Sequence, residues 1–211
     1  MITEEQARAY YADNDASHDF DHVLRVTRLA ERIARAEGAD WAVVRTAALL
    51  HDIGRAEQSR TGACHAGTGA RRAREILAAC RPEFVEAVAH AIAAHRYRDP
   101  GNAPRTLEAK VLFDADKLDA IGAIGVGRAF AMAGKRRQHL WSPLDSPVVG
   151  DQSAIVEGVT EDHTPVQEYL FKLRHLRDAM FTNTGRTLAA GRHRFMAAFF
   201  ERLEREVKGE L

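Results

Sequence analysis

The sequence of 211 residues predicts an all-α protein. Apolar residues recur at steps of three and four along several segments, which is the period of an amphipathic helix. No segment alternates convincingly between apolar and polar residues, as a half-buried strand would. Proline and glycine stand where helices are expected to begin and end, and the chain contains no internal repeat. We therefore expect one helical domain that spans residues 1–211.

Three helices are expected in the N-terminal part. A capping box at Thr3 opens a short helix that runs to about Tyr11. A longer amphipathic helix spans about 19–37, and a third helix begins after the N-cap Asp40. This third helix is almost continuously apolar, so it should be buried, and we expect Gly54 to close it.

Proline, glycine and apolar spacing also set the later elements. Residues 57–64 are expected to form a loop. Prolines and glycines without sustained periodicity predict a long exposed loop or lid at 138–164. Further helices are expected at about 65–79, 82–95, 106–118, 165–180 and 187–207, of which the last two close the fold over about 165–208.

Composition excludes several classes of protein. With 45% hydrophobic and 28% charged residues, the chain matches neither a disordered protein nor a membrane-spanning one. Thirty basic and thirty acidic residues cancel, so we expect no nucleic-acid partner. The acidic, polar N-terminus does not resemble a secretory signal, and a cytoplasmic location follows. Cys64 and Cys80 form no CxxC pair and are expected to be free thiols.

A metal site is predicted at the end of the buried helix. An ionised Asp52 beside His51 would be costly there unless a positive or strongly hydrogen-bonding group met it. Imidazole and carboxylate ligands suit one divalent ion among Mn, Mg, Fe, Co, Ni and Zn. His22 lies on a helix that should pack nearby, and Asp116 is one of three carboxylates that interrupt the otherwise apolar segment 113–119. The alternative is a buried hydrogen-bond network without metal.

His22, His51-Asp52 and Asp116 resemble, in order and rough spacing, the signature of HD-domain metal phosphohydrolases. The motifs HDFDHVLRV at 18–26, LLHDIG at 49–54 and DADKLDAIGAIG at 114–125 are similar to those of bacterial members. The resemblance implies an HD-type helical bundle whose metal-site core spans about 15–135. The C-terminal part, from 171 onward, is similar to a small stand-alone branch that includes nucleoside triphosphate pyrophosphohydrolases.

The resemblance also implies a mechanism and a substrate class. A metal ion polarises a phosphoryl oxygen and activates a bound water for attack on phosphorus, and Asp52 would orient that water. Lys117 follows Asp116 directly, and we expect it to contact the substrate phosphate as a catalytic and binding cation. The expected substrate is a small phosphorylated molecule, above all a nucleoside triphosphate that is cut to monophosphate and pyrophosphate. Phosphomonoesterase, cyclic-nucleotide phosphodiesterase and non-catalytic nucleotide-binding activity remain alternatives.

Several other side chains are candidates for contacts to substrate phosphates. His90 and His95 differ by about 140° around a helix and cannot both point inward, so a second metal is possible but not favoured. His18 is expected either to share a face with His22 or to serve the start of its helix. We expect a monomer or homodimer with no membrane contact. The candidates for phosphate contacts are Arg25, Arg55, Arg128, His65 and His95.

Overall fold

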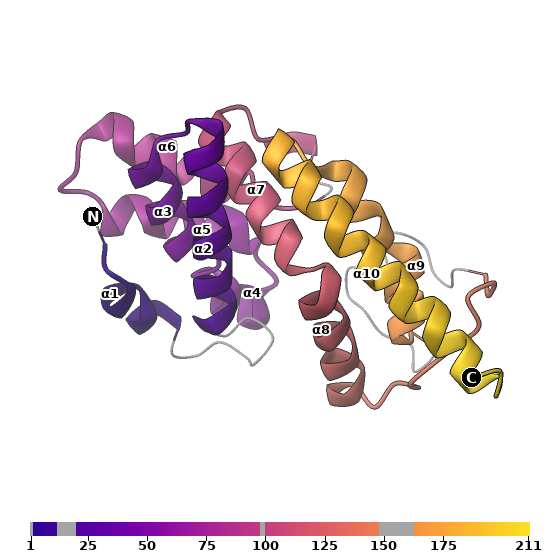
Figure 1. The fold of residues 1–211 in the computed structure, drawn as a ribbon. Helices are drawn as coiled ribbons and strands as arrows, with labels where there is room; N and C mark the ends of the chain where they lie inside the picture. Colours follow the sequence, from indigo (N-terminus) through magenta and orange to yellow (C-terminus); the bar gives the residue numbers. More distant parts are fainter. Residues whose placement is uncertain (1, 12–19, 98–99, 148–162) are drawn as a thin grey trace. The chain divides into compact units, whose positions relative to one another are not determined.

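The computed structural model describes residues 2–11, 20–97, 100–147 and 163–211 (Figure 1). Helices, turns and loops make up these segments, with no strand among them, which confirms the all-α class. The chain divides into two compact units, one of residues 1–119 and 180–185, the other of residues 120–179 and 186–211. One domain over 1–211 stays a prediction. No helix in the described segments is long and apolar enough to cross a membrane.

The first unit is a helical bundle built around α2, α3, α6 and α7. Helix α2 packs against α3 and α7, while α6 packs against α3, α5 and α7 (Figure 1). Side chains from these four helices, including Ile33, Leu49, Ile92 and Leu112, are completely buried in its core. Its elements are α1 (Glu4–Arg8), η1 (Ala9–Tyr11), α2 (Phe20–Glu37), α3 (Trp41–Leu50), α4 (Arg55–Thr61), α5 (His65–Ile76), α6 (Pro82–Ala93), η2 (Pro100–Asn102) and α7 (Leu107–Asp119).

Helix starts follow the capping signals of the sequence. Thr3 and Gln6 form the expected capping box, in which each side chain accepts a hydrogen bond from the other residue's backbone N–H. Asp40 caps α3 by accepting from the backbone N–H groups of Ala42 and Val43. These caps confirm the predicted starts of two helices and fix the direction of the buried helix α3.

The predicted loop at 57–64 is wrong, because α4 occupies Arg55–Thr61. Gly54 does not close α3, which ends at Leu50, but stands at the N-cap of α4 with φ −84°. A side chain at Gly54 would overlap the carbonyl oxygen of His65. Glycine is therefore needed at this position for the close approach of two chain segments, and not for a left-handed helix end.

The second unit contains α8 (Gly122–Lys135), α9 (Pro165–Phe171), η4 (Leu173–Ala179) and most of α10 (Asn183–Val207). The predicted helix at 165–180 is interrupted at Lys172, whose φ of −129° ends α9, and a 3₁₀-helix follows. Residues 138–147 contain no helix, as expected. The rest of the predicted lid up to residue 162 lies outside the described residues.

Candidate metal centre

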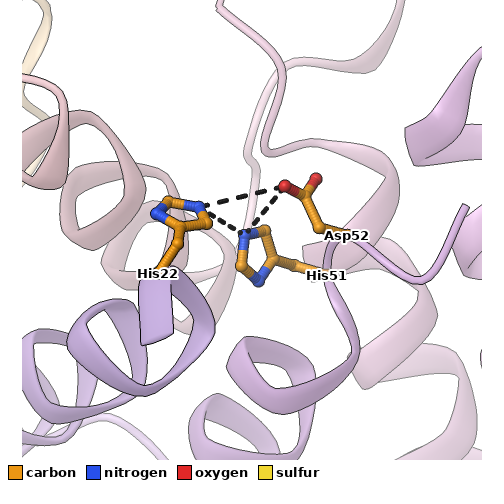
Figure 2. A group of neighbouring side chains, drawn as sticks. All are labelled: His22, His51 and Asp52. Carbon is orange, nitrogen blue, oxygen red and sulfur yellow. Dashed lines mark hydrogen bonds and ion pairs between the residues drawn. The ribbon is translucent and has the colours of Figure 1, made fainter. Parts of the chain in front are cut away.

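Three side chains of the first unit surround the His22 Nε2 atom. His22 comes from the first turn of α2, His51 and Asp52 follow the end of α3, and Asp116 belongs to α7. The His22 Nε2 atom lies 3.3 Å from His51 Nε2, 3.9 Å from Asp52 Oδ2 and 3.5 Å from Asp116 Oδ1. Figure 2 shows His22, His51 and Asp52 turned toward one another. The structure thus brings together the four side chains that the sequence nominates as ligands.

The ring orientations of His22 and His51 are fixed by hydrogen bonds at Nδ1, on the side of each ring that faces away from the cluster. His51 Nδ1 lies 2.8 Å from the carbonyl oxygen of Ala48, and His22 Nδ1 lies 2.7 Å from Asp119 Oδ2. A carbonyl oxygen only accepts, and the Asp119 carboxylate is paired with the guanidinium of Arg25, so both Nδ1 atoms act as donors. When each ring is neutral, its Nε2 atom therefore carries a lone pair that faces the cluster.

This donor set fits a divalent cation. Burial lowers the pKa of His51 to about 4 against the opposing charge of Asp52, so the ring is neutral at pH 7. When both rings are neutral, the two imidazole lone pairs 3.3 Å apart have no proton to share, and Asp52 Oδ2 is buried without a hydrogen-bond partner in the described chain. Such an arrangement of acceptors is unfavourable unless a positive ion lies between them. His22, His51 and Asp52 could hold a metal ion, since their ligand atoms lie within 4.8 Å of one another.

Both carboxylates of the cluster are held in the charged state. Burial raises the pKa of Asp52, but interactions led by the charge of Arg55 outweigh burial and hold it well below its ordinary value. Burial likewise raises the pKa of Asp116, but interactions led by the Lys117 ammonium lower it to well below its ordinary value. Lys117 donates a hydrogen bond to Asp116 Oδ2, so this lysine already contacts the cluster.

A second group of ligand types surrounds the other oxygen of Asp52. His65 opens α5, and His95 lies two residues beyond the end of α6, where the sequence had placed it inside the helix. His95 Nε2 is 3.5 Å and His65 Nε2 is 3.7 Å from Asp52 Oδ1, and the two nitrogens are 3.2 Å apart. His90, by contrast, accepts a hydrogen bond from the backbone N–H of Arg105. Asp52, His65 and His95 therefore form a second group with the spacing of a metal site.

The three arginines proposed for phosphate contacts have different positions. Arg55, the first residue of α4, donates from Nε to Asp52 Oδ1 at 2.9 Å. Arg25 donates two hydrogen bonds to Asp119, at 2.8 and 3.1 Å. Arg128 belongs to α8 in the second unit, and His18 lies outside the described residues. Contact of these arginines with a substrate stays a prediction.

Two carboxylates of α7 have structural partners that the sequence did not reveal. Asp119 orients His22 and pairs with Arg25, although it is only 1% exposed. Asp114 is completely buried and accepts from the backbone N–H groups of Phe181 and Thr182 and from the Thr182 hydroxyl. The signal for both was present, because charged residues rarely interrupt an apolar helix unless they have partners.

Several known proteins are similar to this chain in sequence and in fold. The HD domain family matches residues 19–121. YpgQ of Bacillus subtilis is 34% identical over 200 residues, which are 93% of this chain and 88% of YpgQ. The crystal structure of YpgQ in complex with ADP has a TM-score of 0.73 at 32% identity and covers 98% of this chain and 99% of that one. An HD-superfamily hydrolase from Bacillus thuringiensis has a TM-score of 0.73 at 27% identity, over 97% and 94% of the two chains. Ribonuclease Y of Chloroflexus aurantiacus is 35% identical over 111 residues, which are 53% of this chain and only 20% of that protein.

Proposed function

This chain belongs to the HD domain family, and we propose on that premise that it is a metal-dependent phosphohydrolase whose ion is held by His22, His51, Asp52 and Asp116. The observation that carries the proposal is the meeting of two imidazole lone pairs and two ionised carboxylates around one point. These are ligands that Mn²⁺ and related ions accept, and four protein ligands leave coordination positions for water and substrate.

In the proposed reaction the metal ion and the protein side chains have different roles. A bound divalent ion would polarise a phosphoryl oxygen and lower the pKa of a water molecule. Asp52, which is buried and ionised, would accept a hydrogen bond from such a water and orient it toward phosphorus. Lys117 neutralises Asp116 and places an ammonium beside the cluster, where it can also donate to a phosphate oxygen.

Basic and imidazole side chains near the cluster are proposed to bind the substrate phosphates. Arg55, His65 and His95 border the Asp52 carboxylate and would contact the transferred phosphoryl group or its neighbour. Arg25 and Arg128 stay proposed as further contacts to phosphate oxygens. A nucleotide is favoured because YpgQ, which aligns with nearly this whole chain, has been crystallised with ADP. We assign hydrolysis of a nucleoside triphosphate to monophosphate and pyrophosphate as the specific reaction.

Product analysis tests the reaction. The purified protein is incubated with Mn²⁺, Mg²⁺, Co²⁺ or Ni²⁺ and with nucleoside triphosphates, diphosphates, monophosphates, cyclic nucleotides and a short RNA, and products are separated by chromatography. Asp52→Asn removes one ligand charge, and Asp178→Asn makes the same exchange on an exposed side chain. The proposal requires metal-dependent pyrophosphate that Asp52→Asn abolishes and Asp178→Asn leaves unchanged.

The other outcomes reassign the protein. Release of single phosphate would make it a phosphatase, and cleavage of the cyclic nucleotide or of the RNA would make it a phosphodiesterase. No product from any substrate, together with a thermal shift on adding ADP, would make it a nucleotide-binding protein without turnover.

A further inference from the structure

The two oxygens of Asp52 face two different groups of imidazoles. Oδ2 lies 3.7 Å from His51 Nε2 and 3.9 Å from His22 Nε2, while Oδ1 lies 3.5 Å from His95 Nε2 and 3.7 Å from His65 Nε2. All five side chains are buried. By composition and spacing alone, both groups could hold a metal ion, with Asp52 shared between them.

The protons of the two groups are arranged differently. His95 Nδ1 lies 2.6 Å from the carbonyl oxygen of Ile92, so it donates there and leaves Nε2 as an acceptor in the neutral ring. His65 Nε2 lies 3.2 Å from that acceptor and can donate its proton to it. The His65–His95 pair can therefore share an N–H···N hydrogen bond, which leaves His65 Nδ1 buried without a hydrogen-bond partner in the described chain. In the His22–His51 pair each Nδ1 donates outward, to Asp119 and to the carbonyl oxygen of Ala48, so no proton lies between the two Nε2 atoms when both rings are neutral.

A cation is also already present on one side of Asp52. Arg55 Nε donates to Oδ1 at 2.9 Å, and Arg55 Nη1 lies 3.4 Å from Gln58 Oε1 one turn along α4. Oδ2 has no hydrogen-bond partner in the part of the chain that is described. Arg55 is only partly exposed and Asp52 is buried, so little water screens the charge of the guanidinium at this oxygen.

From this asymmetry we propose that Arg55 limits the centre to one metal ion, because its guanidinium occupies the Asp52 oxygen that a second ion would share with His65 and His95. This inference rests on the proposed function, which places the first ion at Oδ2. A second divalent cation would have to displace the guanidinium, remain close to its positive charge, and break the His65–His95 hydrogen bond. Removing the guanidinium removes the first two obstacles.

Counting bound Mn²⁺ tests the role of Arg55 without reference to turnover. Wild type and the variants are dialysed against Mn²⁺ at a series of free concentrations, and bound metal per chain is measured by elemental analysis. Arg55→Gln and Arg55→Met remove the charge, Arg55→Lys retains it, and Arg60→Gln removes the same charge from an exposed position on α4. Two neutral variants are included so that poor folding of one leaves the other to decide.

The expected result is one Mn²⁺ per chain for wild type, Arg55→Lys and Arg60→Gln, and two for the neutral Arg55 variants at concentrations that saturate the first site. Adding His95→Ala to Arg55→Gln should return the count to one. Two ions in wild type, or one ion in both neutral variants, would overturn the role of Arg55. A wild-type count of zero that His22→Ala leaves unchanged would instead reject the proposed metal centre itself, so the two failures are distinguishable.

Discussion

Exchanging Asp119 for asparagine should weaken metal binding without removing any proposed ligand. The Asp119 carboxylate accepts hydrogen bonds from His22 Nδ1 at 2.7 Å, Arg25 Nε at 2.8 Å and Arg25 Nη2 at 3.1 Å. An amide presents one oxygen and one NH₂ group to the same donors. In Asp119→Asn, either His22 or Arg25 must therefore face an N–H group, and the His22 ring loses its fixed orientation or its charged partner.

The expected loss of metal affinity follows from the contact of Asp119 with His22, a proposed metal ligand. Loss of an orienting carboxylate behind a metal-bound histidine typically costs about 10- to 100-fold in affinity, which is about 1.4–2.7 kcal/mol. Because Asp119 is buried at 1% exposure, lost hydrogen bonds to its charge should also lower the free energy of unfolding by about 1.5–3 kcal/mol. Arg25 is about one-third exposed, so water can solvate it once the pair is broken.

A matched variant separates orientation of His22 from general stability. Glu37 lies on the same helix α2 and its Oε1 accepts from the backbone N–H of Thr184 at 2.6 Å, away from the cluster. Titration calorimetry with Mn²⁺ and urea unfolding are measured for Asp119→Asn and Glu37→Gln. Both should unfold more easily, and only Asp119→Asn should bind Mn²⁺ more weakly. Equal Mn²⁺ affinity in Asp119→Asn and wild type would refute the orienting role.

Two further predictions concern stability. In Gly185→Ala the new methyl group would overlap the Asp114 carboxylate, so urea unfolding should show a loss of about 2–3 kcal/mol, whereas Gly191→Ala has open space and should gain up to about 1 kcal/mol. Equal stability of the two variants would contradict this. Burial raises the pKa of Glu168, but Lys172 and a neighbouring histidine outweigh it and lower the pKa from 4.5 to about 2. The charged Glu168 therefore stabilises the fold by about 3 kcal/mol above pH 4.5, and this contribution is lost as pH falls toward 2. The stability difference between wild type and Glu168→Gln should shrink over that range, and a difference independent of pH would contradict the prediction.

Helix positions were predictable where apolar period and caps agree. Asp40 and the apolar run behind it predicted α3, and the buried residues of α2 follow the three- and four-residue steps seen in the sequence. Helix α4 was missed for a physical reason. None of its seven residues is buried, so it has no apolar face and leaves no period to detect. Gly54 was interpreted as a helix end because glycine often ends helices. The sequence does not show that the backbone of His65 lies beside Gly54, which is the reason for glycine here.

The proposed metal ligands were easier to predict from the sequence than the ion-pair partners of arginine and lysine side chains. Each ligand stands in a short motif, whereas Arg25 pairs with Asp119, 94 positions away. A sequence shows that an arginine can bind an anion, but not whether a phosphate or a carboxylate of the same chain takes the position. The same holds for Lys117, whose ammonium contacts its own neighbour Asp116. Charge type was therefore predictable, and its pairing depended on the fold.

The ring orientations of His22, His51 and His95 depend on where each histidine stands relative to a helix. His51 and His95 lie just beyond two apolar helices, and each ring donates from Nδ1 to the carbonyl three residues back. Carbonyls at a helix end lose the regular N–H donor four residues ahead, and a buried end has little water to replace it. An imidazole satisfies the carbonyl and presents its Nε2 lone pair on the opposite side. His22 stands in the first turn of α2, and its Nδ1 donates instead to Asp119 from α7. The ring orientations of His51 and His95 therefore depend on the helix that precedes each of them, whereas that of His22 depends on a carboxylate that only the tertiary structure identifies.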